Sequence, residues 1–340
     1  MSATSLKKIL KTPFHLSKTQ VLHFSKLDET LQQQVARDFV TVLPGQGLLV
    51  VAGKDAGQFL QGQLSCDVTK IDGAHSSLGL HCTPQGRVIT SFRLCQTDPE
   101  HYAMLVPIDV APLLHKSLAR YIVFSKASND DQSAEHVVFG ISGDSANGAL
   151  KHQFGAIPET VNAQVNAGGA WCTRVPGDKP RYQLCLPTRQ ASEFWELASA
   201  ACQPADSSAW SLQDMRSGLA TITTQTTEMF IPQMLDFDRV DAINFNKGCY
   251  TGQEIIARAH YRGTVKRRLH HFICRTGLQP STNQQLFLGD KPVGTLVNWV
   301  QPEPNTLEGL LVLQENIREP VHFFGADAAS FTATPCHPTE

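Results

Sequence analysis

The order of expected elements between residues 136 and 201 constrains the fold of this chain more than any other feature. Apolar patterning predicts strands at 136–141, 170–173 and 182–186, a helix that starts at Ala146, and a helix over 190–201. The order strand, helix, strand, strand, helix is typical of a ferredoxin-like α+β unit. We therefore expect a mixed fold in which such a unit is one part.

The rest of the chain is long enough for further domains. At ~150 residues per domain, 340 residues correspond to two or three of them. Other expected elements are strands at 48–51, 87–94 and 102–106, a helix capped by Asp55, and helices over 111–121 and 210–219. The polar run 128–133 indicates a loop. After Arg268, short strands separated by Gly and Pro predict a small all-β domain.

Charge and hydropathy exclude two broad classes of protein. The 29 Lys and Arg against 31 Asp and Glu give a net charge of −2, which argues against a generally basic nucleic-acid binder. No apolar run approaches the ~18 residues that span a bilayer, so we expect no membrane association. The lysine-dotted N-terminus lacks an apolar signal segment and lacks the arginines of a transit peptide. We interpret residues 1–19 as a solvated tail of a cytoplasmic protein.

The nine cysteines do not form a recognisable metal-binding pattern. They are Cys66, Cys82, Cys95, Cys172, Cys185, Cys202, Cys249, Cys274 and Cys336. Without a Cys-x-x-Cys pair, a zinc ribbon or a self-contained iron–sulfur site is disfavoured. We expect most of these thiols to be buried as small apolar groups in a reducing compartment.

The densest chemical signal is the segment Asn246-Lys247-Gly248-Cys249-Tyr250-Thr251-Gly252-Gln253-Glu254. Thr251 and Glu254 match a capping box, which predicts a helix that begins near Thr251. Cys249 then precedes a helix N-terminus, and both the helix dipole and Lys247 favour its thiolate. We therefore expect a thiol pKa below the usual ~8.5. The alternative is a cysteine packed in a tight turn.

A basic stretch follows this motif, and no Asp or Glu occurs from Ile255 through Gly289. Its charged members are Arg258, Arg262, Lys266, Arg267, Arg268 and Arg275, with His260, His270 and His271 among them. The stretch fits either a phosphate or carboxylate ligand or a solvated face whose partners lie elsewhere in the chain. Trp210 likewise fits either a platform for a flat heterocycle or a core residue.

Several motifs in this order resemble the YgfZ family of folate-binding proteins. They are Phe59-Leu60-Gln61-Gly62-Gln63 with Asp67-Val68, Gly86-Arg87-Val88, Tyr121 with Phe124-Ser125-Lys126, Phe230-Ile231-Pro232-Gln233, the motif Lys247 to Glu254, Ala257-Arg258, Tyr261-Arg262-Gly263 and Lys266-Arg267. The eight-residue cysteine motif is the most specific of these matches. The resemblance covers residues 48–268.

The resemblance implies the α+β fold of the glycine-cleavage T-protein, a folate-dependent aminomethyltransferase. That fold is a three-domain cloverleaf, here with a ferredoxin-like middle unit and a small C-terminal β-barrel-like domain. We expect the central folate-binding domain to combine residues 20–127 and 206–262. The middle unit is then 128–205, and the β domain is 263–340.

The resemblance also implies a function and a set of site residues. Members of the family support the assembly or repair of iron–sulfur clusters in client enzymes, such as radical enzymes that thiolate tRNA. The implied functional thiol is Cys249, with Lys247 beside it, and Cys249 is a candidate shared ligand of a transient cluster or a redox-active thiol. The implied contacts to tetrahydrofolate or a derivative are Trp210, Tyr250, Gln253, Arg258 and Arg262.

Three departures from the family pattern limit the chemistry. Thr90 and Ser91 stand where the T-protein has an aspartate pair, and neither can act as a carboxylate base. A pterin-recognising glutamate falls at Arg216, and a second folate-contacting tryptophan falls near Gln46. The first two differences argue against aminomethyl transfer, which remains the alternative function, and the third concerns folate affinity. Direct tRNA binding through the basic stretch ranks below both.

Overall fold

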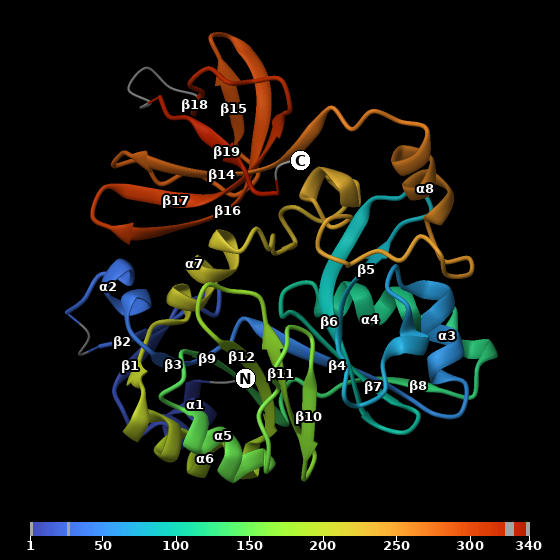
Figure 1. The fold of residues 1–340 in the computed structure, drawn as a ribbon, viewed down its shortest axis with the longest axis vertical. Helices are drawn as coiled ribbons and strands as arrows, with labels where there is room; N and C mark the ends of the chain where they lie inside the picture. The colour runs from blue at the N-terminus through green and yellow to red at the C-terminus, as the bar shows by residue number, and fades with distance from the viewer. Residues whose placement is uncertain (1–2, 26–27, 324–329, 338–340) are drawn as a thin grey trace.

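Three sheets of five or six strands surround one central helix in the computed structural model, which describes residues 3–25, 28–323 and 330–337 (Figure 1). The helix, α7 (Ser207–Arg216), contacts strands of the first and third sheets. Its residues Ala209, Trp210 and Leu212 are buried in one apolar cluster with residues of the first and second sheets. Among the described residues no helix is long and apolar enough to cross a membrane.

The first sheet contains the expected ferredoxin-like order. Its strands, in spatial order, are β10 (Gln164–Ala167), β11 (Ala170–Val175), β12 (Arg181–Pro187), β9 (His136–Ser142), β3 (Phe39–Val42) and β13 (Gln203–Pro204). The helices α5 (Asn147–Phe154) and α6 (Thr188–Ala201) cover one face with an apolar core. The predicted strands and helices are present in the predicted order, with one additional strand, β10, between α5 and β11. Helix α6 starts two residues earlier than expected.

The expected solvated tail over residues 1–19 is wrong for the described part of that segment. The N-terminal elements are α1 (Ala3–Leu10), β1 (Phe14–Leu16), β2 (Leu22–Phe24) and α2 (Leu31–Ala36). Leu6, Ile9 and Leu10 form a helical face that is buried in the core beneath the first sheet. The indole of Trp195 in α6 also donates a hydrogen bond to the Leu10 carbonyl at 3.0 Å. The lysines of this segment are exposed. They suggested a solvated tail, although the residues between them form an apolar helix face.

The second sheet is antiparallel and carries two helices. Its strands, in spatial order, are β5 (Ser77–Cys82), β6 (Val88–Asp98), β7 (His101–Pro107), β4 (Gln46–Ala52) and β8 (Ser128–Asp131), with α3 (Ala56–Gln63) and α4 (Ala111–Ala119). The segment 128–133, expected as a loop, begins with edge strand β8, which pairs with β4. An edge strand can be fully polar because one of its sides faces solvent. Asp55 does not cap α3, since its carboxylate accepts a hydrogen bond from the Lys126 backbone.

The first two sheets each contain a strand from beyond the domain boundary that we expected at residue 128. Strand β3 precedes this boundary and pairs with β9 of the first sheet, whereas β8 follows it and pairs with β4 of the second sheet. Each sheet therefore receives one strand from the other side of the boundary. This exchange holds the first two sheets together.

The third sheet is formed by the C-terminal part of the chain. Its strands, in spatial order, are β18 (His322–Phe323), β15 (Gln285–Leu288), β16 (Lys291–Glu303), β17 (Thr306–Gln314), β14 (Arg267–Arg275) and β19 (Ala333–Pro335). Within the described ranges the sheet is open and not a closed barrel, because its end strands β18 and β19 are only two and three residues long and do not pair with each other.

The remaining elements are short. They are α8 (Gln253–Tyr261) and the 3-10 turns η1 (Val68–Lys70), η2 (Ile122–Phe124) and η3 (Pro232–Leu235). Helix α7 begins at Ser207 and ends at Arg216, three residues before the expected end at 219. The helix ends early because Gly218 adopts a φ of +67°, which is incompatible with continuing a right-handed helix.

We predict that Leu6→Ala lowers the free energy of unfolding by about 2–5 kcal/mol, because the removed side chain is fully buried. Urea denaturation of the purified protein measures this change. The control is Lys7→Ala on the exposed face of the same helix, expected to stay within about 0.5 kcal/mol of the parent. Equal, small effects of both changes would contradict the packing of α1.

Candidate functional site

Helix α7 directs Trp210 and Asp214 to the same side, because they lie four residues apart. The indole of Trp210 packs directly on Gly140 of β9, where any added Cβ would overlap the ring. Glycine at position 140 is thus a steric requirement of the Trp210 position. Only 4% of Trp210 remains exposed.

Arg181 of β12 joins these two residues. Its Nη2 donates to the Asp214 carboxylate at 2.6 Å, and its guanidinium carbon lies 4.0 Å from the centre of the Trp210 ring. Burial raises the pKa of Asp214, and the nearby Arg181 opposes that change. The arrangement is a buried ion pair beneath an aromatic ring, and Asp214 keeps 24% of its side chain exposed.

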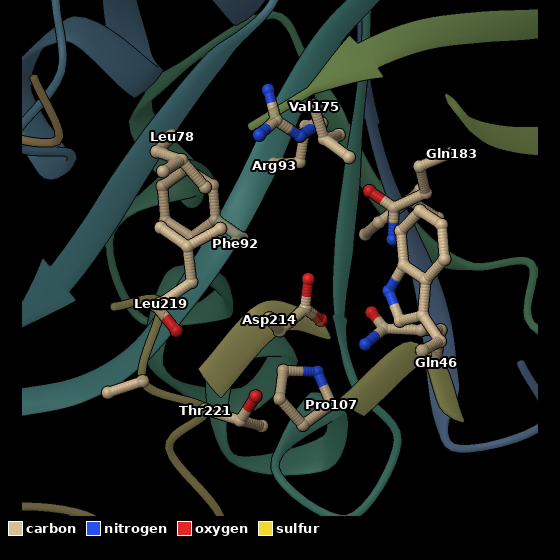
Figure 2. A pocket seen from close by; sticks show the side chains of 14 residues that line it. Gln46, Leu78, Phe92, Arg93, Pro107, Val175, Gln183, Asp214, Leu219 and Thr221 are labelled. Carbon is tan, nitrogen blue, oxygen red and sulfur yellow. The ribbon is translucent and has the colours of Figure 1, made fainter. Parts of the chain in front are cut away.

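A cavity that is open to solvent lies beside this ion pair. Its lining residues are Gln46, Leu78, Ser91, Phe92, Arg93, Leu105, Pro107, Val175, Gln183, Trp210, Asp214, Leu219, Ala220 and Thr221. Figure 2 shows the side chains of Gln46, Arg93, Gln183 and Asp214 gathered around one space. Apolar walls with a few convergent polar groups are typical of small-molecule sites.

The structure shows where the residues that depart from the family pattern lie relative to the cavity. Ser91 and Gln46 do line the cavity, whereas Thr90 is fully buried. Arg216 does not line it, because its guanidinium is bound to Glu308 at 2.7 and 2.8 Å. Asp214, two residues earlier, supplies the carboxylate at the cavity instead. A missing glutamate at position 216 is therefore no obstacle to recognition of a ligand with N–H donors.

The cysteine motif lies outside the cavity, as a loop anchored on the second sheet. Lys247 donates from Nζ to the carbonyls of Leu64 and Cys66 at 2.8 and 2.7 Å. Burial lowers the pKa of Lys247 to about 8, although Cys66 and Asp67 oppose the change. The ammonium group thus holds the backbone after α3. Cys249 is exposed and unbonded to any other cysteine of the described chain.

The expected capping box at Thr251 and Glu254 is wrong. Helix α8 begins at Gln253, and Gly252 before it adopts a φ of +84° and makes no side-chain cap. This turn directs the Thr251 hydroxyl to Gln63 at 3.3 Å, while the Gln253 side chain accepts from the Tyr250 backbone at 3.2 Å. Cys249 therefore lies four residues before the helix, and the capping geometry behind the expected thiolate is absent.

The other predicted site residues occupy different surroundings. Tyr250 is buried, with the Lys247 ammonium 5.2 Å from its ring centre, and within the described residues its hydroxyl makes no hydrogen bond. Arg258 and Arg262, at the end of α8, are exposed. Of the predicted site residues, Trp210 alone lines the described cavity, so the structure does not bring the set together.

The basic stretch divides into bound and free members. Arg268 is bound to Asp236 and Asp238, and His271 is bound to Glu308. The exposed members are Arg258, His260, Arg262, Lys266, Arg267 and Arg275. The interpretation that the stretch has its partners elsewhere in the chain thus holds for Arg268 and His271. The exposed arginines and lysine in or beside α8 and β14 form no ion pair with any residue that the structure describes.

Sequence reasoning missed the polar residues that shape the cavity. Arg93 lies in β6, and Arg181 and Gln183 lie in β12. The available signal was an arginine, in or next to a predicted strand, whose nearest neighbours are uncharged. Asp214 could have been found from its spacing to Trp210. No cluster of three or more His, Cys, Asp or Glu able to hold a metal occurs in the ranges that the structure describes.

We predict that Gly252→Ala destabilises the protein, because a Cβ there would lie 2.5 Å from the Thr83 carbonyl oxygen at a left-handed φ. Strain of this kind costs about 1–3 kcal/mol. Gly248→Ala in the same motif is the matched control, since its Cβ would meet open space. Chemical denaturation of both variants checks the difference. A Gly252→Ala protein as stable as the Gly248→Ala protein would contradict the turn.

Comparison with known proteins places this geometry in a family. No protein-family model matches the chain. The tRNA-modifying protein YgfZ of Photobacterium profundum is 31% identical over 313 residues, which cover 90% of this chain and 92% of that protein. The protein of the same name from Edwardsiella ictaluri is 35% identical over 221 residues, covering 64% of this chain and 66% of that protein.

A solved structure supports the fold. The glycine cleavage system aminomethyltransferase T from Bartonella henselae matches 97% of this chain and 94% of its own with a TM-score of 0.77, at 13% sequence identity. This likeness confirms the expected α+β fold of the T-protein kind. Together with the identity to the two relatives, it leads to one conclusion: the chain belongs to the YgfZ family.

Proposed function

We propose that the protein binds a reduced folate, tetrahydrofolate or a derivative, in the central cavity. The observation that carries this proposal is the placement of Asp214 and Trp210 at an apolar-walled cavity, in the fold of a folate-dependent aminomethyltransferase. The lining residues other than Val175 and Gln183 come from segments 20–127 and 206–262, the proposed central domain.

The chemistry of the lining fits a pterin ring. A pterin presents a ring N–H and an amino group side by side, and a carboxylate such as Asp214 accepts from both. Leu78, Leu105 and Leu219 supply apolar contacts for its faces. Trp210 is covered by Arg181, so a ligand contacts the exposed edge of the indole or displaces the guanidinium.

The same lining does not favour aminomethyl transfer. Asp214 is the only carboxylate among the described lining residues, and it is bound to Arg181. Ser91 lies at the cavity where the T-protein has an aspartate, and a hydroxyl is a poor base at neutral pH. We therefore assign the protein a binding role and not that reaction.

We infer that this folate-binding protein supports the assembly or repair of iron–sulfur clusters in client enzymes of the cytoplasm. Its relatives are named for tRNA modification, and we propose that this connection runs through client enzymes that thiolate tRNA. Cys249 is the working thiol, because it is exposed on an anchored loop. A cluster in transit would share Cys249 with ligands from a client, since the described residues contain no group of three or more His, Cys, Asp or Glu that could hold a metal by itself.

We assign the exposed arginines at the end of α8 to contact with the client. Arg258 and Arg262 are exposed and do not line the cavity, so we propose that they meet an acidic surface of a partner protein beside the motif. Tyr250 and Gln253 then support the loop that carries Cys249.

Replacing Trp210 tests the folate site. We expect Trp210→Leu to weaken tetrahydrofolate binding about tenfold or more, because contact with an aromatic ring is worth roughly 1–3 kcal/mol. Anaerobic titration calorimetry measures the affinity, and circular dichroism confirms that the variant is folded. Trp195→Leu is the matched control, since Trp195 is equally buried but lies in the core beneath the first sheet. The assignment is wrong if the two variants bind equally well.

Replacing Cys249 tests the thiol. With limiting alkylating agent we expect Cys249 to react first of the nine cysteines, because it is exposed while burial raises the pKa of both Cys66 and Cys82 to about 12. Mass mapping reads out the modified residue.

A complementation experiment tests whether the Cys249 thiol is needed for function. Cys249→Ser should retain folding and tetrahydrofolate affinity but fail to complement a strain that lacks the protein, because serine removes the soft ligand and nucleophile. Cys336→Ser, at a half-buried thiol, is the control and should complement. Full complementation by Cys249→Ser would refute the role of the thiol.

A further inference from the structure

Arg93 is a buried cation that the functions described so far do not use. It lies in the middle of β6, is 4% exposed, and lines the central cavity. Its guanidinium is permanently charged at any physiological pH. No carboxylate lies within 4.0 Å of it in the described chain, because none of the ion pairs there includes Arg93.

The charges around the cavity do not balance. Arg93 and Arg181 both lie in the electrostatic neighbourhood of Asp214, and Asp214 is bound to Arg181. Among the described residues this region therefore holds two guanidinium groups, of Arg93 and Arg181, and one carboxylate, of Asp214. A buried charge without a counter-charge is strongly unfavourable, so this arrangement favours binding of an anion.

The hydrogen bonds of Arg93 leave most of its donors free. A guanidinium has five N–H donors. Nη1 uses two of them, on Ser76 at 3.2 Å and on Asn162 at 2.8 Å. No described residue accepts from Nε or Nη2, which is three of the five donors. The bonds from Nη1 hold the group in place, and the remaining donors form the fork that binds a carboxylate with two parallel bonds.

The other groups at the cavity are compatible with an anion. Ser91, two residues earlier on β6, also lines the cavity, and so do Thr221 and Gln46, which have uncharged donor groups. Figure 2 shows Arg93 and Asp214 in the same space, with no second acidic side chain among those drawn.

We propose that Arg93 is a carboxylate-binding residue of the central cavity. The carboxylate belongs either to the glutamate of the bound folate or to a separate small carboxylic acid that enters the cavity with it. The first source rests on the proposed folate function, and the second does not. In both cases the anion is recognised by Arg93, in the same cavity that Asp214 lines.

The test compares ligands with and without a carboxylate. Tetrahydrofolate carries the pterin ring and the glutamate, 6-methyltetrahydropterin carries the ring without any carboxylate, and glycine and acetate carry a carboxylate without the ring. Affinities come from anaerobic calorimetry, and binding of the small acids is read from the thermal midpoint. The proteins are the parent, Arg93→Gln, Arg93→Lys, and Arg174→Gln as a control at an arginine outside this cavity.

The two sources predict different results. If the folate glutamate is bound, Arg93→Gln loses at least tenfold in tetrahydrofolate affinity, keeps its 6-methyltetrahydropterin affinity, and Arg93→Lys falls between. If a separate acid is bound, glycine or acetate raises the thermal midpoint of the parent and of Arg174→Gln but not of Arg93→Gln.

Two outcomes overturn the proposal. One is an equal loss for tetrahydrofolate and 6-methyltetrahydropterin, which would mean that Arg93 contacts the ring or only supports the fold. The other is that no carboxylate-bearing ligand distinguishes the parent from Arg93→Gln. A parent that binds small acids but no folate would refute the folate function and leave the carboxylate site standing. Arg93→Lys keeps the charge and so remains informative if Arg93→Gln does not fold.

Discussion

Two ion pairs along α7 fix the helix against two different sheets, and the cavity depends on them. Asp214 binds Arg181 of β12, and Arg216 binds Glu308 of β17. Burial raises the pKa of Glu308, but hydrogen bonds from Arg216 and His271 outweigh it and bring the pKa to about 2. Removal of Asp214 would leave the buried Arg181 guanidinium without its carboxylate, and breaking a buried pair in this way typically costs about 3–5 kcal/mol. Electrostatics thus adds to packing in holding α7 where the sheets meet.

Strand β5 connects the cavity with the cysteine motif. Leu78 near its start lines the cavity, while Leu80 and Cys82 pack in the same apolar cluster as Tyr250. The molecule therefore separates a sheltered place for a small molecule from an exposed thiol, and one strand supports both. This separation is what an accessory protein needs, because a ligand gains affinity from burial while a partner must reach Cys249 from solvent.

Local patterns predicted helices and strands well, and they failed where a distant contact took over a side chain. The apolar patterns located α6 and the strands β9, β11 and β12 of the first sheet to within a few residues, and they missed β3, β10 and β13. Asp55 and Thr251 carry the right side chains for caps, yet Lys126 and Gln63 engage them instead. The N-terminal segment was misjudged because its lysines outnumber the few apolar residues that bury α1.

The sequence by itself determined the element order, the family resemblance and the presence of one unusual cysteine motif, because these depend on neighbouring residues and their spacing. Only the tertiary structure decided which charges meet. Asp214 and Arg181 are 33 positions apart, and Arg216 and Glu308 are 92 apart. Nothing in the local pattern around Arg93 shows that its guanidinium lacks a carboxylate partner. Such pairings follow from how sheets pack, since a buried charge is stabilised by whichever opposite charge the fold brings near it.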